Sequence, residues 1–301
     1  MKRPNLKDPN DWLYALCSAI AAVFILATSA IALVYLIVMA PSEAHVLGEG
    51  EDPVGYEMPI ICGIVFTVCL ILVVKDLIKR MRGCPREEMC GRYMGTWMSR
   101  TATLFSLMIF TTILVIAPIY LLGSEITEDF IGKMTTYENI ASMMIAGPEE
   151  EFIFRVLLIG LPMIVICALT HRFRFRDVIG GFGTSRAALV LILISAVLFG
   201  LAHIDGWSVM KFYDTFVSGL LLGYVYVQYG VHVTIVAHSA LDMISSMDLL
   251  FGEFGLLPLY FTVGLGAVLM VRSLFKIREY IPKNNLHEPF DGSLLEMWER
   301  R

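Results

Sequence analysis

Charged residues are scarce in this 301-residue sequence, because Asp, Glu, Lys and Arg together make up only 17% of it. A soluble domain is about a quarter charged. Hydrophobic residues account for 57%, and the mean hydropathy is +0.70. They come in blocks of about twenty, which is the length of helix that crosses a bilayer. The composition therefore excludes an ordinary soluble domain and predicts an all-α fold, a polytopic membrane helix bundle.

Metal-binding and redox motifs are also lacking. The six cysteines form no CxxC pair and no Cys/His spacing typical of a zinc site, and no HExxH is present. We therefore expect reduced thiols and neither a metal nor another cofactor. No nucleic-acid partner is expected, because membrane topology explains the basic loops. The first apolar block, 14–40, is too long for a cleaved signal peptide and is interpreted as a retained span.

Eight apolar segments are candidate membrane spans, and they cover 14–40, 58–78, 101–123, 143–170, 186–204, 211–229, 231–250 and 256–275. Lys and Arg are retained on the cytoplasmic side of a membrane protein. All 23 of these residues except Lys133, Arg155 and Lys211 fall in or next to the two tails and the loops after the second and fourth segments. This distribution predicts eight transmembrane helices with both the N and the C terminus in the cytoplasm.

The organisation expected from this pattern is one integral-membrane domain over 1–301. Its catalytic helices are expected within 143–250, and a cytoplasmic tail over 276–301. The expected location is the cell membrane, as a multi-pass protein of a prokaryotic plasma membrane. The stretch GLLLG, 219–223, has small residues four apart, which indicates close helix packing or, alternatively, a dimer face.

Ionisable residues interrupt the fourth segment in the stretch GPEEEFIFR. A charge at the centre of a spanning helix costs about 2.5–3.5 kcal/mol, so these groups need partners or a water-filled cavity. Pro148 suits the first turn of a helix, so we expect the helix to begin here, after a flexible Gly147. Intramembrane ionisable residues are candidates for function.

Three sets of polar residues on separate segments define a candidate site. Glu151 and Arg155 are four residues apart on one helical face and can pair. Glu150 points about 100° away and lacks that partner, which favours a role as general base or acid. Two later segments carry Phe199 with His203 and His238 with Asp242, again four residues apart. Each set alone could be structural, but their joint occurrence favours catalysis.

The ordered set resembles the motifs of the CPBP family, the CAAX proteases and bacteriocin-processing enzymes also called Abi proteins. These are intramembrane glutamic proteases, typified by the type II CAAX prenyl endopeptidase. The family's EExxxR is similar to Glu150, Glu151 and Arg155. Its FxxxH is similar to Phe199 and His203, and its HxxxN/D to His238 and Asp242.

The resemblance implies a peptidase that acts on a peptide or protein in or at the lipid bilayer. It implies that Glu150 and His203 activate a water, and that Glu151 and Arg155 support Glu150. It also implies that His238 and the residue at 242 stabilise an oxyanion. The prenyl endopeptidases commonly have Asn at this last position. Asp242 donates a hydrogen bond only when protonated, so it either stays neutral or orients His238 instead.

The residues alone also leave three alternative functions open. Glu150, His203 and His238 form a two-histidine, one-carboxylate set that zinc accepts, as in an intramembrane metalloprotease. Chains of Glu, His and Arg also form proton relays in proton-coupled transporters, although no repeated halves are evident in this sequence. The third alternative is a non-catalytic immunity or scaffold protein.

Overall fold

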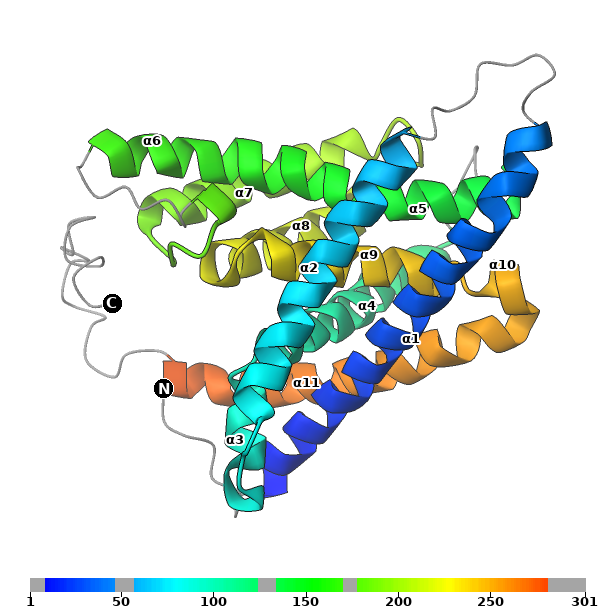
Figure 1. Cartoon of the computed structure of the whole chain (residues 1–301). Helices are drawn as coiled ribbons and strands as arrows, with labels where there is room; N and C mark the ends of the chain where they lie inside the picture. The colour runs from blue at the N-terminus through cyan, green and yellow to red at the C-terminus, as the bar shows by residue number, and fades with distance from the viewer. Residues whose placement is uncertain (1–8, 47–56, 124–133, 170–177, 281–301) are drawn as a thin grey trace.

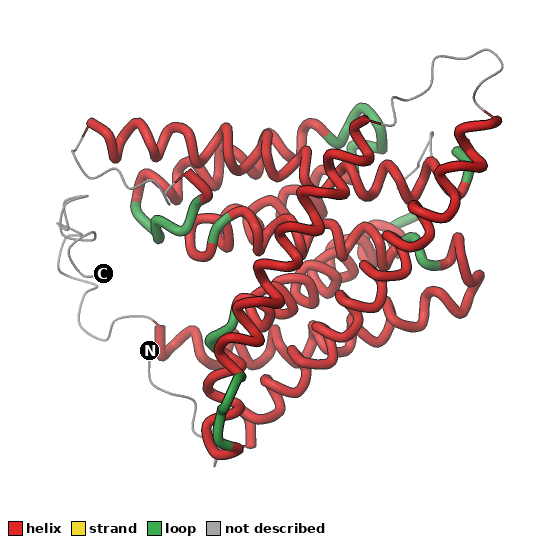
Figure 2. The backbone as a smooth tube through the Cα atoms, viewed as in Figure 1, coloured by secondary structure: helices red, strands yellow, loops and turns green. Residues whose placement is uncertain are grey.

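The computed structural model describes residues 9–46, 57–123, 134–169 and 178–280, which are almost entirely helical (Figures 1 and 2). No strand occurs within these ranges, so the all-α prediction is confirmed. The longer elements are α1 (Pro9–Val46), α2 (Glu57–Met81), α4 (Trp97–Leu121), α5 (Thr136–Glu151), α6 (Leu161–Leu169), α7 (Arg186–Ala202), α8 (Lys211–Tyr229), α9 (Val231–Ser245) and α11 (Leu257–Tyr280). The shorter ones are η2 (Arg86–Glu88), α3 (Met89–Met94), the π-helical segment η4 (Phe152–Gly160), α10 (Asp248–Phe251) and η6 (Gly252–Leu256).

Helices occupy all eight predicted positions, and five stretches are long and apolar enough to cross a membrane. They are Trp12–Met39, Met58–Met81, Trp97–Leu121, Thr136–Leu169 and Val231–Leu274. Large apolar side chains such as Ile37, Ile60 and Leu189 point outward, while hydroxyl groups such as those of Ser18 and Ser106 are buried. This distribution suits a surface that faces lipid, and the chain is a multi-pass membrane protein. Most of the predicted tail, 281–301, lies outside the described residues.

The helix α9 lies at the centre of the bundle. Every residue from 232 to 240 is buried, and α9 contacts α2, α4, α5 and α8. In Figure 1, α5 and α6 form one nearly continuous rod along one side, α7 and α8 lie beside it, and α1 and α2 cross in front at a steep angle. Polar residues on α5, α7 and α9 can therefore meet inside the bundle.

The helix that carries the three glutamates begins earlier than expected, so the prediction of a start at Pro148 is wrong. A capping box fixes the start of α5: Thr135 accepts from the backbone of Glu138, whose side chain accepts from the backbone of Thr135. The helix then continues through Pro148 to Glu151 and changes to the π-helical geometry of η4. Gly147 is a buried contact point within a helix, rather than a flexible hinge before one.

The packing interpretation of GLLLG is confirmed by the contact between α7 and α8. A Cβ atom on Gly219 would meet Ala196 at 3.0 Å, and one on Gly223 would meet Ile192 at 3.0 Å. Hydrogen atoms at these two positions therefore let α8 approach α7 closely. A Cβ atom on Gly219 would also meet the Phe199 ring at 3.2 Å, so this contact positions the residue one turn before His203.

Candidate active site

The approach of α5 to α9 depends on Gly147. A Cβ atom at this position would overlap the hydroxyl group of Ser239 on α9. Without a side chain at 147 the two helices come together, one turn before Glu150 and Glu151. The two glutamates are thereby brought beside His238, which precedes Ser239 on α9.

Glu151 joins two partners in the interior. Its side chain is fully buried, and its Oε1 lies 2.9 Å from Nδ1 of His238 while its Oε2 lies 3.3 Å from Nε of Arg155. Because an ionised carboxylate only accepts, Nδ1 of His238 carries the proton that it donates to Glu151. This contact fixes the orientation of the His238 ring and leaves its Nε2 facing the other polar groups.

The guanidinium group of Arg155 is also fully buried, and it lies over the Phe199 ring, 4.5 Å from the ring centroid. Its charge is compensated by Glu151 and by the negative face of the aromatic ring. Within the described part of the chain, its terminal nitrogens have no hydrogen-bond partner. Arg155 lies in η4, so this segment brings it to the end of α7.

Phe199 also sets the state of His203 at the end of α7. Its carbonyl oxygen lies 2.8 Å from Nδ1 of His203, and the two rings pack edge to face with centroids 4.6 Å apart. A carbonyl only accepts, so the proton of a neutral His203 is on Nδ1. The lone pair on Nε2 then points toward Glu150. This arrangement gives a physical reason for the spacing FxxxH.

Glu150 stands between the two histidines. Its Oε2 lies 3.7 Å from Nε2 of His203 and 3.6 Å from Nε2 of His238. Both distances are too long for a direct hydrogen bond, but one water molecule can bridge groups at this separation. The side chain of Glu150 is 25% exposed and that of Glu151 is 0% exposed, so of these two carboxyl groups only that of Glu150 reaches the surface, although its Oε2 is buried.

Asp242 completes the group on α9. Its Oδ2 lies 3.7 Å from Nε2 of His238, and this oxygen has no hydrogen-bond partner among the described residues. The structure thus brings together all four residues expected to be catalytic, Glu150, His203, His238 and Asp242. The three expected supporting residues, Glu151, Arg155 and Phe199, lie directly behind them. One detail differs from expectation, because Glu151 contacts His238 as well as Arg155.

One lysine near the site was not predicted from the sequence. Lys211, the first residue of α8, lies 2.9 Å from Oδ2 of Asp214 and over the ring of Trp207. Asp214 is buried, and its Oδ1 accepts a 2.6 Å hydrogen bond from Thr112. The beginning of α8 lies against the end of α7, which leads to His203, because a Cβ atom on Gly200 would meet the Phe212 ring at 2.8 Å. The spacing of Lys211 and Asp214, three residues apart, is the signal that could have revealed this pair.

Residues 133–244 match the family model described as "Type II CAAX prenyl endopeptidase Rce1-like". This part of the chain is Rce1-like. It spans α5 to α9 and contains every residue of the candidate site, and the match confirms the resemblance to the CAAX proteases. No curated protein and no solved structure matches the chain.

The Rce1-like segment supports a membrane protease, and the transporter and scaffold alternatives are not favoured. In the described ranges no group of three or more His, Cys, Asp or Glu side chains has the geometry to hold a metal ion. What the segment does offer is a carboxylate oxygen that lies 3.7 and 3.6 Å from the facing nitrogens of two imidazoles.

Proposed function

We propose that this protein is an intramembrane endopeptidase that hydrolyses a peptide bond in a membrane-associated or lipid-linked protein or peptide. The proposal depends chiefly on the position of Glu150 Oε2, which lies 3.7 Å from His203 Nε2 and 3.6 Å from His238 Nε2. A family described as CAAX prenyl endopeptidases acts on substrates held at a membrane, and an active site inside the bundle suits such substrates.

The nucleophile in this proposal is a water molecule held between Glu150 and His203. Both Glu150 Oε2 and the unprotonated Nε2 of His203 are acceptors, so the water donates one hydrogen to each. Its lone pairs then point away from the two acceptors, toward the carbonyl carbon of a peptide bond. As the water attacks, Glu150 takes its proton as general base. The same proton can pass to the leaving amine when the carbon–nitrogen bond breaks.

His238 stabilises the negative charge that develops on the carbonyl oxygen. Its Nδ1 proton is committed to Glu151, so donation to the oxyanion needs a second proton on Nε2. The surrounding carboxylates of Glu150, Glu151 and Asp242 favour this positively charged ring. In this scheme Asp242 orients His238 and is not itself the donor. Glu151 acts as a positioning residue for His238, and Arg155 neutralises Glu151.

A peptidase assay in membranes, with candidate lipid-linked and leader peptides, tests the proposal. Glu150→Gln removes the base while preserving size, and we expect the rate to fall by about 10²–10⁴. Glu149→Gln is the matched control, because Glu149 is the adjacent residue and is exposed. Equal activity of the two variants would contradict the assignment.

Treatment with a chelator separates this mechanism from the zinc-dependent one. The Glu/His mechanism predicts that the rate does not change in chelator. Loss of activity that zinc restores would instead support the metalloprotease. Charge movement across liposomes that depends on Glu150, without any cleavage, would support transport.

The proposed topology has eight spans with both termini in the cytoplasm of a prokaryotic cell, and the basic loops support it. It places Cys84 on the cytoplasmic side and Asp205 on the outer side. The test uses a thiol reagent that does not cross the membrane, on a protein that is otherwise free of cysteine. Cys84 should react with it only in inverted vesicles, and Asp205→Cys only in intact cells. Labelling of both residues from one side would contradict this arrangement.

A further inference from the structure

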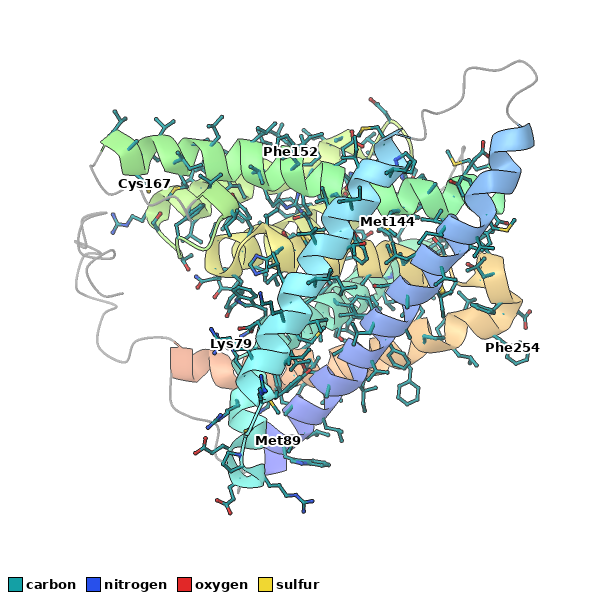
Figure 3. All side chains as sticks on the ribbon, in the orientation of Figure 1. Lys79, Met89, Met144, Phe152, Cys167 and Phe254 are labelled. Atoms are coloured by element: carbon teal, nitrogen blue, oxygen red, sulfur yellow. The ribbon has the colours of Figure 1, made fainter. Side chains whose placement is uncertain are left out.

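A second group of charges lies far from the Glu150 site, at the end of α2. Here a cavity of about 370 Å³ opens between α2 and α3, and its lining consists of Lys79, Arg80, Gly91, Arg92 and Gly95. Three of these five residues are cations, and the other two have no side chain. Figure 3 shows Lys79 at the same end of the molecule as Met89, the first residue of α3.

The cations around this cavity are not fully neutralised by nearby carboxylates. Arg80 lies 2.8 Å from Asp76, and Arg92 lies 2.9 Å from Glu88. Each guanidinium has five N–H donors, so most of its hydrogen-bonding capacity is left for a ligand. Among the described residues, no carboxylate lies within ion-pair distance of Lys79. The cavity therefore carries a net positive charge.

The scaffold that holds these cations is fixed. Asp76 bonds Arg80 and also accepts a 2.8 Å hydrogen bond from the backbone nitrogen of Trp97, which connects the end of α2 to the start of α4. The Tyr93 hydroxyl on α3 lies 3.2 Å from the hydroxyl of Ser18 on α1. Burial raises the pKa of Tyr93 to about 12, in agreement with a helix packed firmly against the bundle.

The cavity lies at the level where two membrane spans meet the aqueous phase. The second span ends at Met81, just after Lys79, and the third begins at Trp97, just after Gly95. Tyr and Trp are enriched at this level of membrane proteins. Ile71 and Ile78, farther into the span of α2, are more than half exposed and offer an apolar surface next to the cavity.

We infer that this cavity binds the phosphate group of an anionic lipid whose acyl chains lie along α2. Basic pockets at the ends of membrane helices on the cytoplasmic side bind lipid headgroups of this kind. Free phosphate has the same headgroup chemistry, but the apolar surface beside the cavity favours the lipid. The inference goes beyond the proposed peptidase function and does not depend on it.

Native mass spectrometry of the full chain in detergent, with phosphatidylglycerol and phosphatidylcholine as probes, tests this inference. We expect phosphatidylglycerol to bind the more tightly. Each of Lys79→Gln and Arg92→Gln should weaken it about fivefold, and the double variant on the order of twentyfold, since one basic residue contributes about that factor near a lipid surface. Lys75→Gln is the matched control, because Lys75 is exposed on the same helix, one turn earlier, outside the cavity.

Three outcomes would overturn the inference. The first is no preference for phosphatidylglycerol in the unaltered protein. The second is an equal loss of binding in Lys75→Gln, which would indicate general surface charge. The third is binding of inorganic phosphate, measured by thermal shift and lost in the cavity variants, without any preference for the anionic lipid. Circular dichroism of each variant establishes that the helices are retained.

Discussion

The interior cluster around Glu150 and the basic end of α2 and α3 both concentrate charge, but they differ in how that charge is held. In the interior, Glu151 and Arg155 are 0% exposed and each contacts two groups. At the end of α2 and α3, Arg92 and Glu88 form a pair with side chains 42% and 51% exposed. Both pairs have the same spacing of four residues, so the spacing alone does not distinguish them, and only the apolar residues around Glu151 and Arg155 do.

The difference between the two pairs lies in what happens when one partner is removed. An exposed ion pair contributes little, because water solvates either partner alone. A buried partner left alone retains an uncompensated charge at low dielectric, which strongly destabilises the fold. A pair that is partly buried should lose an intermediate amount of folding stability when one partner is removed. Lys211 and Asp214 form such a pair.

Arg155→Ala is expected to have the largest effect on stability. It leaves the buried carboxylate of Glu151 without its cation, and the expected loss is about 3–5 kcal/mol. Denaturation in detergent, followed by circular dichroism, measures the loss. The double variant Glu151→Gln/Arg155→Met removes both charges and should recover part of it. A loss below about 1 kcal/mol for Arg155→Ala would show that burial does not control how much stability is lost when one partner of an ion pair is removed.

Gly147→Ala changes the packing of α5 against α9 and leaves every charge in place, so it tests the effect of packing alone. The new methyl group overlaps the hydroxyl of Ser239, and overpacking of this kind costs about 1–3 kcal/mol. We expect α5 to move away from α9 and cleavage activity to fall with stability. Adding Ser239→Gly removes the closest of the overlapping atoms and should partly restore both cleavage activity and stability. Full activity in Gly147→Ala alone would contradict the role given to this contact.

Lys211→Met tests the case between the two extremes. The lysine side chain is 18% exposed and that of Asp214 is 5% exposed, so we expect a loss of about 1–2 kcal/mol, between the surface and the buried values. The hydrogen bond from Thr112 continues to hold Asp214. Thermal denaturation at low and high salt gives the measurement. A loss of stability as large as that of Arg155→Ala would contradict the expected relation between the burial of an ion pair and the stability lost when one partner is removed.

Arg92→Ala should have the smallest effect on stability. Exposed pairs four residues apart on a helix contribute about 0.3–0.5 kcal/mol, and salt screens them. We expect a change close to the limit of detection that disappears at high ionic strength. A loss above about 1 kcal/mol would mean that α3 is held to the bundle through this pair.

Much of the site could be predicted, because helical spacing sets which residues share a face. Pairs four residues apart placed Glu151 with Arg155, Phe199 with His203 and His238 with Asp242. The family motifs then indicated that the three pairs belong together, and the structure has them in contact. The helix class followed from composition alone, because only helices bury the backbone polar groups of such long apolar segments.

The start of the glutamate-bearing helix was not predicted correctly, because two signals competed. Pro148 is typical of a first turn, but Thr135 and Glu138 form the capping-box pattern and determine the start of α5. The capping-box pattern is therefore the stronger of the two signals here. The π-helical geometry of η4 and the role of Gly147 could not be predicted in this way. Both depend on contacts with α7 and α9, which no local sequence pattern contains.

The way in which Phe199 holds His203 has a consequence for how this protein tolerates substitution. The acceptor for Nδ1 is the main-chain carbonyl of Phe199, whereas the ring of Phe199 supports Arg155. A change of side chain at 199 therefore spares the acceptor that fixes the tautomer of the histidine, but it removes the ring that packs against both Arg155 and His203. Phe199→Leu should therefore lower stability and loosen the position of the imidazole, while the proton of the imidazole stays on Nδ1.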